Sequence, residues 1–142
     1  MKIGIINGPN LNLLGSREPQ IYGTTPLEEL NEGLKTFGQS LNMSLSFFQS
    51  NHEGELIDHI HSLRGAVDGL VVNAGAFTHT SLALKDALAA TEIPFIEVHL
   101  SNIYAREAYR HHSYLSSMAR GCICGFGIDT YKLALQAWTF LP

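Results

Sequence analysis

Short apolar runs alternate with segments of helical periodicity along this chain, and this alternation constrains the fold more than any other feature. The apolar runs are Ile3–Ile6, Leu45–Phe48, Gly69–Val72, Phe95–Val98 and Cys122–Phe126. Apolar residues recur at helical spacing in Leu27–Leu41, Leu56–Leu63, Leu82–Leu88 and Asp129–Phe140. Strands that alternate with helices form a parallel sheet, because right-handed crossovers carry the helices over both of its faces.

The pattern predicts a three-layer α/β sandwich with a five-stranded parallel sheet, and fold frequency favours the flavodoxin-like strand order. The 142 residues, 45% of them hydrophobic and 15% charged, fit one globular domain over residues 1–142. The last apolar run carries Cys122 and Cys124 at alternate positions. We expect them to share one face of a strand as buried thiols, too closely tethered for a disulfide.

The charge and hydropathy of the chain exclude several classes of partner. The net charge of −4 provides no basic stripe for nucleic acid. No apolar run approaches the roughly 20 residues that span a bilayer, and Met1 leads directly into a strand without a signal-peptide pattern. We therefore expect a cytoplasmic protein that binds neither nucleic acid nor membrane.

Polar residues follow each of the first four predicted strands. In chain order they are Asn7, Asn10, Asn12, Asn51, His52, Asn73, His79, His99, Ser101 and Asn102. Ligands of open parallel sheets bind beyond the carboxyl ends of the strands, where these residues meet. The amides and imidazoles predict a site for a small, oxygen-rich molecule.

Familiar cofactor and metal motifs are missing from this edge. The glycines fit neither GxGxxG nor GxxxxGK[ST], so neither common nucleotide-binding loop is expected. No HExxH or Cys/His ligand spacing is found. We expect no metal and no cofactor, although a flavin- or nucleotide-binding protein of the same fold stays open as an alternative.

The segment GSREPQIYG, residues 15–23, separates the first strand from the first predicted helix and holds Arg17 and Tyr22. Long connections in compact domains are often lids or binding loops, so we interpret residues 15–25 as a lid. A phenol titrates near pH 10, so Tyr22 could act as a base at neutral pH only if a nearby cation stabilised its phenolate. Arg17 could be that cation. Alternatively, Tyr22 simply packs its ring and Arg17 is a solvated charge.

In IEVHLSN, Glu97 and His99 stand two apart on a strand and share a face. A neighbouring carboxylate orients an imidazole and raises its pKa, which suits a general acid. A core histidine bonded to backbone is an equal alternative. After it, Ser101 or Asn102 should cap a helix through Ala105–Tyr109, whose free N–H groups would favour an anion such as a substrate carboxylate.

Other polar positions have a structural and a functional interpretation. Asn10 and Asn73 either cap turns or donate hydrogen bonds to hydroxyls and developing negative charge. His79 either caps the helix that follows it or binds a ligand. Asp86 and Arg110 are, on position alone, a solvated carboxylate and a cation at a helix C-terminus.

Four long blocks resemble the type II 3-dehydroquinate dehydratases. They are GPNLNLLGSREPQIYG, FQSNHEGELIDHIH, NAGAFTHTSLALKDAL and IPFIEVHLSNIYAREAYRHHSYLS, with ICGFG near the end. The resemblance extends from Ile3 to about Trp138. It implies a hydro-lyase of the shikimate pathway that converts 3-dehydroquinate to 3-dehydroshikimate through an enolate by syn elimination, without a metal or a Schiff-base lysine.

The resemblance also implies roles for individual residues. Tyr22 would be the base, Arg17 its phenolate stabiliser, His99 the acid and Glu97 its support, while Asn10 would hold a water that stabilises the enolate. Substrate would be bound by Asn73, His79, Arg110 and the backbone of Leu100 and Ser101. Asp86 would reach the site of a neighbouring subunit in a dodecamer of four trimers. The main alternative is a non-catalytic sugar-acid-binding module, which would leave Tyr22, Arg17 and His99 without a common purpose.

Overall fold

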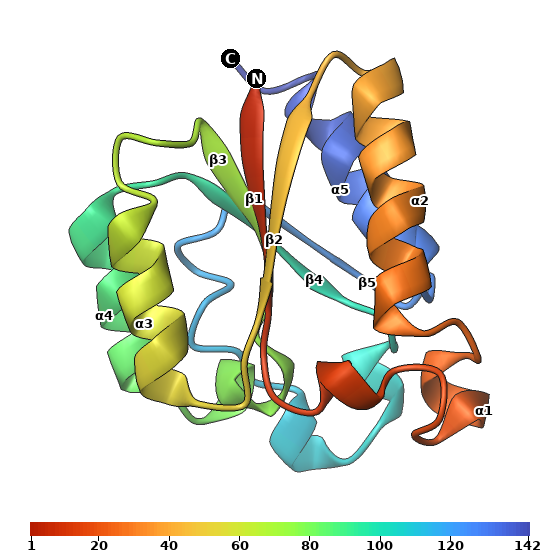
Figure 1. Cartoon of the computed structure of the whole chain (residues 1–142). Helices are drawn as coiled ribbons and strands as arrows, with labels where there is room; N and C mark the ends of the chain where they lie inside the picture. Colours follow the sequence, from red (N-terminus) through yellow and green to blue (C-terminus); the bar gives the residue numbers. More distant parts are fainter.

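The protein is described by a computed structural model covering residues 1–142, and its centre is a five-stranded parallel sheet (Figure 1). The strands run in the order β2-β1-β3-β4-β5. Their bounds are β1 Lys2–Asn7, β2 Ser44–Gln49, β3 Gly69–Asn73, β4 Phe95–His99 and β5 Gly121–Cys124. Both the parallel sheet and the flavodoxin-like order predicted from the sequence are confirmed.

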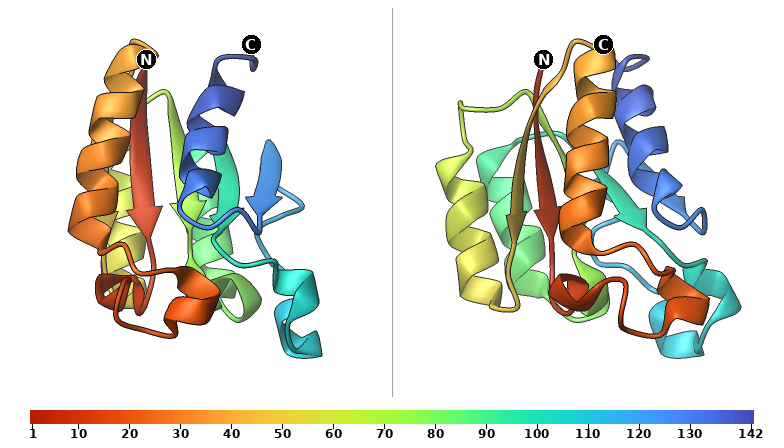
Figure 2. Two further views of the ribbon diagram at one scale, coloured as in Figure 1. Left: turned by 90° about the vertical axis from the view of Figure 1, so that its right-hand side faces the viewer. Right: turned by 45° about the vertical axis from the view of Figure 1, so that its right-hand side comes forward.

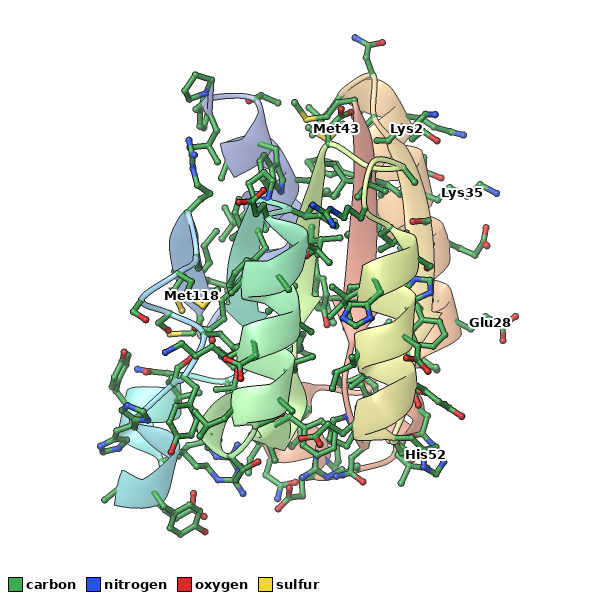
Figure 3. The ribbon with its side chains drawn as sticks, turned by 90° about the vertical axis from the view of Figure 1, so that its left-hand side faces the viewer. Lys2, Glu28, Lys35, Met43, His52 and Met118 are labelled. Atoms are coloured by element: carbon green, nitrogen blue, oxygen red, sulfur yellow. The ribbon has the colours of Figure 1, made fainter.

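Two helices cover each face of the sheet. Helices α2 (Leu27–Ser40) and α5 (Asp129–Trp138) lie on one face, and α3 (Glu53–Ser62) and α4 (Leu82–Thr91) lie on the other, as Figure 2 shows. Alternate strand residues point to opposite faces, so the sheet divides the interior into two apolar clusters. In Figure 3, α3 and α4 lie side by side. They cover the apolar cluster on their own face of the sheet. No helix has the length and apolar character needed to cross a membrane.

The carboxyl ends of the strands lie at one edge of the molecule, opposite the two chain termini (Figure 1). Asn7 and Asn73, the last residues of β1 and β3, are register partners. Short helices follow the strands at this edge: η1 (Leu11–Leu13) and α1 (Pro19–Tyr22) after β1, η2 (Gly75–His79) after β3, and η3 (Ile103–Ala105) and η4 (Ala108–Arg110) after β4.

The fifth strand departs from the sequence prediction. It ends at Cys124, because Gly125 turns the chain with a φ of 97°. The two cysteines are free thiols, but Cys122 is exposed and Cys124 is half-buried. The expectation of buried thiols was therefore wrong: β5 is an edge strand, with β4 as its only neighbour in the sheet.

The predicted helix through Ala105–Tyr109 is also absent. The segment instead forms η3 and η4, two three-residue 3₁₀ helices separated by extended backbone at Arg106. Asn102 does cap the first of them, because its side chain accepts a hydrogen bond from the Tyr104 N–H. Arg110 therefore does not stand at the end of a long helix with a macrodipole, and no α-helix N-terminus stands there to bind an anion.

Candidate active site

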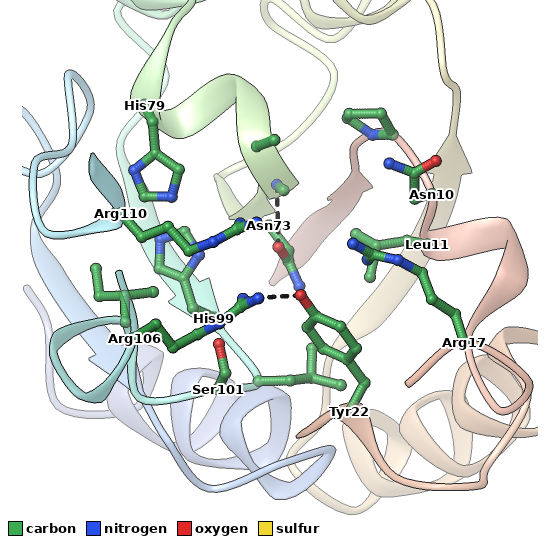
Figure 4. A pocket seen from close by; sticks show the side chains of 15 residues that line it. Asn10, Leu11, Arg17, Tyr22, Asn73, His79, His99, Ser101, Arg106 and Arg110 are labelled. Atoms are coloured by element: carbon green, nitrogen blue, oxygen red, sulfur yellow. Dashed lines mark hydrogen bonds between the residues drawn. The ribbon is translucent and has the colours of Figure 1, made fainter. Parts of the chain in front are cut away.

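A cavity of about 220 Å³ opens at the carboxyl edge of the sheet (Figure 4). Its walls combine residues from the segments after β1, β3 and β4. The lining consists of Pro9, Asn10, Leu11, Arg17, Tyr22, Asn73, Gly75, Ala76, His79, His99, Leu100, Ser101, Ile103, Arg106 and Arg110. The residues to which the family resemblance gives a role all line this cavity except Glu97 and Asp86. Five of the other polar residues that follow the predicted strands do not line it: Asn7, Asn12, Asn51, His52 and Asn102.

The β4 wall is deeply buried. His99 is 5% exposed and Glu97, one pleat earlier on the same face, is fully buried. The Nε2 atom of His99 lies 3.7 Å from Glu97 Oε1, which is a charge–charge distance and longer than a hydrogen bond. Neither His99 nitrogen has a hydrogen-bond partner within the chain, and Nε2 is itself buried.

Glu97 is the acceptor of a dense set of hydrogen bonds. Thr78 Oγ1 donates at 3.1 Å and Ser113 Oγ at 2.5 Å to Oε1, while Ser116 Oγ and Cys122 Sγ donate to Oε2. Burial alone would raise the pKa of Glu97, but His99 and the serine hydroxyls outweigh it and lower that pKa to about 2. The carboxylate therefore keeps its charge, and its environment fixes its orientation beside His99.

The wall formed by residues 15–23 is built differently. Its backbone takes left-handed or otherwise unusual conformations at Gly15, Glu18 and Gly23, with φ values of 97°, 38° and 84°. Pro19 starts the four-residue helix α1, which sequence periodicity did not reveal because four residues are too few to show a period. Tyr22, the last residue of α1, is half-buried against the cavity.

Two guanidinium groups lie against Tyr22. Arg17 sits over its ring, with Cζ 4.7 Å from the centroid, as the sequence interpretation required of a cation near the phenol. Arg106 donates a hydrogen bond from Nη1 to the Tyr22 hydroxyl at 2.8 Å, shown as a dashed line in Figure 4. Both guanidinium groups therefore place positive charge beside the Tyr22 ring and hydroxyl.

Sequence reasoning missed Arg106. It lies in a charged stretch expected to form a helix, where an arginine is usually a solvated charge. The extended backbone at Arg106 turns its side chain toward Tyr22, 84 residues earlier, and Glu107 stands beside it. Glu107 also accepts a 2.9 Å hydrogen bond from Arg110. The usable signal was position, because Arg106 follows β4 at the edge where the other site residues meet.

The β3 end contributes two groups whose orientations are fixed by backbone. Asn73 is 3% exposed, and its Oδ1 accepts a hydrogen bond from the Gly75 N–H at 3.2 Å. His79 Nδ1 lies 2.7 Å from the His112 carbonyl, so Nδ1 carries the proton. Burial lowers the pKa of His79 below its usual value, which keeps the ring neutral at pH 7. His79 ends η2, whereas Ser81 caps α4.

The two remaining candidates, Asp86 and Asn10, differ in their position. Asp86 is exposed on α4 and does not line the cavity. Asn10 does line it, in a left-handed conformation with φ of 69°, but its side chain forms no cap for η1. No group of three or more His, Cys, Asp or Glu side chains is placed to hold a metal ion.

A family model described as Dehydroquinase class II matches residues 1–139 of the chain. The chain belongs to this family. The resemblance inferred from the sequence blocks is thereby confirmed, and the matched region contains every residue of the cavity.

Individual class II dehydroquinases match over nearly the whole chain. A 3-dehydroquinate dehydratase of Prochlorococcus marinus is 57% identical over 136 residues, covering 96% of this chain and 94% of that protein. A catabolic 3-dehydroquinase of Emericella nidulans is 56% identical over 140 residues, covering 97% and 92% respectively. The crystal structure of type II dehydroquinase from Butyrivibrio crossotus superposes with a TM-score of 0.95 at 44% identity, covering 98% and 97%.

Proposed function

We propose that this chain is a 3-dehydroquinate dehydratase, a hydro-lyase that removes water from 3-dehydroquinate to give 3-dehydroshikimate. The observation that carries this proposal is the convergence of Tyr22, two guanidinium groups and the Glu97–His99 pair on one cavity. Relatives more than half identical over almost the entire chain are named for this activity.

The proposed mechanism begins with proton abstraction. Tyr22, as a phenolate, takes the proton from C2 of the substrate, next to the ketone, and the C–H electron pair becomes the enolate. Arg17 and Arg106 supply the charge that lets a phenol act as a base near neutral pH. Asn10 on the cavity wall would hold a water that stabilises the enolate oxygen.

Loss of the hydroxyl completes the reaction. The enolate collapses to form the C1–C2 double bond as the C1 hydroxyl leaves. The leaving hydroxyl takes a proton from His99 and departs as water. In the proposed syn elimination, the C2 proton and the C1 hydroxyl leave from the same face of the substrate ring. Glu97 would support this step because its negative charge lies 3.7 Å from the His99 ring. Tyr22 then returns its proton to solvent and His99 is reprotonated, which resets the site.

The remaining wall residues would bind and orient the substrate. Asn73, His79 and Arg110 would contact its hydroxyls, and the backbone of Leu100 and Ser101 its carboxylate. The segment of residues 15–25 would act as a lid that brings Tyr22 and Arg17 to bound substrate and excludes water. No lysine lines the cavity, in keeping with a route that forms no Schiff base.

The product is a conjugated enone, which gives a direct test. Mixing the protein with 3-dehydroquinate should raise the ultraviolet absorbance of the enone, and borohydride added during turnover should leave the protein unmodified. Binding of substrate without any rise in absorbance would refute the dehydratase and favour the sugar-acid-binding module. A lysine adduct trapped by borohydride would refute the proposed route.

We also propose that the chain assembles as a dodecamer of four trimers. Asp86 supports the idea, since it lies outside its own cavity on exposed α4 and is free to reach a neighbouring subunit. Light scattering of the purified protein should give a mass near twelve times 15.6 kDa. A monomeric mass with full activity would refute both the assembly and the role of Asp86.

A further inference from the structure

A buried tyrosine outside the cavity forms a hydrogen bond with Asn73, a residue of the cavity wall. Tyr131 lies on α5, is fully buried, and is not among the cavity-lining residues. Its hydroxyl lies between the side chains that end β1 and β3: it donates to Asn7 Oδ1 at 2.5 Å and accepts from Asn73 Nδ2 at 2.9 Å. Nothing in the proposed reaction uses this hydroxyl.

The direction of these hydrogen bonds is fixed by a backbone group. The Gly75 N–H can only donate, so the Asn73 side-chain atom that faces it must be Oδ1. Nδ2 therefore faces Tyr131, and the Tyr131 proton must point to Asn7 Oδ1. Burial raises the pKa of Tyr131 above its usual value, so the hydroxyl keeps this proton. Asn73 therefore donates to Tyr131, and Tyr131 donates to Asn7. The reverse direction would leave the Gly75 N–H without an acceptor.

These hydrogen bonds determine which group of the Asn73 side chain is available to a ligand in the cavity. The Asn73 carboxamide has one acceptor atom and two N–H hydrogens. Gly75 uses one of the two lone pairs of Oδ1, and Tyr131 takes one Nδ2 hydrogen, which leaves the second Nδ2 hydrogen without a partner in the chain. Since Asn73 lines the cavity, a ligand meets a hydrogen-bond donor there.

We infer that Tyr131 is a positioning residue that locks Asn73 as a hydrogen-bond donor and so selects ligands with an oxygen acceptor, such as a hydroxyl or carbonyl, at that point. The inference rests on the proposed function only in taking Asn73 as a contact of the substrate. Tyr131 acts from the α5 face of the sheet, so it sets specificity without touching the ligand.

The main test is a double-mutant cycle between Tyr131→Phe and Asn73→Ala, measured as kcat/KM in the enone assay. Tyr131→Phe removes one oxygen and leaves the Asn73 N–H without its acceptor, so we expect a loss of about tenfold, mostly in KM. In the Asn73→Ala background the same change should cost almost nothing in kcat/KM. Equal losses in both backgrounds would show that Tyr131 merely supports the fold and would overturn the inference.

Two further variants separate positioning from other effects. Tyr104→Phe removes the hydroxyl of a tyrosine that is 62% exposed and outside the cavity, so kcat/KM should not change. Asn73→Asp keeps the shape of the side chain but offers only acceptors when ionised, and it should lose more activity than Tyr131→Phe. Wild-type kcat/KM in Asn73→Asp would overturn the assignment of a donor.

A crystal structure of Tyr131→Phe gives a readout that does not depend on the reaction. We expect Asn73 Oδ1 to stay on the Gly75 N–H while the carboxamide tilts about that contact, so that Nδ2 moves from its present place. An unchanged position of Nδ2 would overturn the inference, whatever the assay shows. If the wild type forms no enone, the proposed dehydratase fails, and the position of Asn73 in this variant still decides the role of Tyr131.

Discussion

The cavity has two walls of opposite construction. On the β4 wall, His99 and Glu97 sit on a central strand, and Glu97 accepts hydrogen bonds from four side chains. On the wall formed by residues 15–23, Tyr22 sits on a one-turn helix between glycines, and Arg17 is 34% exposed. The group proposed to donate a proton is held rigidly, whereas the group proposed to accept one is carried on a segment with few buried contacts. Chemistry that must exclude water and still admit substrate needs one wall of each kind.

The largest expected effect comes from removing the proposed base on the wall formed by residues 15–23. Tyr22→Phe takes away the oxygen that we propose accepts the C2 proton, so kcat should fall by roughly 10³-fold or more, while binding of 3-dehydroquinate measured by calorimetry persists. Tyr104→Phe serves as the control. Near-normal turnover in Tyr22→Phe would assign the base to another group and remove the functional contrast between the walls.

The second-largest loss of activity is expected from breaking the contact between the two walls, the hydrogen bond from Arg106 to Tyr22. Arg106→Gln keeps a hydrogen-bond donor near Tyr22 but removes the positive charge, so kcat should fall by about 10²-fold while KM changes little. Steady-state kinetics of the variant and the wild type in the enone assay measure this. A loss confined to KM would mean that Arg106 binds substrate and does not activate Tyr22.

On the β4 wall, we expect the Glu97 carboxylate to contribute to the free energy of unfolding. The folded-state pKa of Glu97 is about 2, against a usual value of 4.5. Because the folded pKa is the lower one, this carboxylate stabilises the fold above pH 4.5, and the contribution is lost as the pH falls toward 2. The shift corresponds to about 3 kcal/mol.

Denaturant unfolding at pH 7 and at pH 3 tests this contribution. Glu97→Gln should lower the free energy of unfolding at pH 7 and reduce its dependence on pH in the acid range. Glu32→Gln, at an exposed position inside α2, is the control and should behave like the wild type. An unchanged acid dependence in Glu97→Gln would place the source of acid sensitivity elsewhere.

The smallest effect should come from the backbone of residues 15–25, the proposed lid. Gly23 combines φ of 84° with ψ of −177°, a region that costs other residues about 1–3 kcal/mol, although its Cβ would meet nothing within 4 Å. Gly23→Ala should therefore disfavour the present conformation of this segment and lower kcat by roughly tenfold, with little change in the melting temperature.

Gly33→Ala provides the matched control for that change. Gly33 lies within α2, and a Cβ there also meets nothing. The same substitution should raise the free energy of unfolding by about 0.5–1 kcal/mol and leave kcat unchanged. If Gly23→Ala behaved like Gly33→Ala, the conformation of the lid would not matter for turnover.

The sequence predicted the sheet well because each strand is a buried apolar run, and burial of this kind leaves a strong pattern. It also predicted where His99 and Asn73 would lie, since each stands at the carboxyl end of such a run. It could not predict the hydroxyls around Glu97, because Ser113 and Ser116 come from an irregular segment without periodicity. It placed Cys122 in the interior for a related reason, since an apolar run does not reveal that its strand lies at the sheet edge.

The cavity is lined by segments that follow three different strands, so it exists only when folding brings these segments together. A substrate can therefore bind only the folded form, and at 100 times its Kd it would add about 2.7 kcal/mol to the free energy of unfolding. A plentiful supply of substrate would then protect the protein from proteolysis, and scarcity would shorten its lifetime. The level of this protein in a cell would follow the flow of the metabolite it consumes, without any change in gene expression.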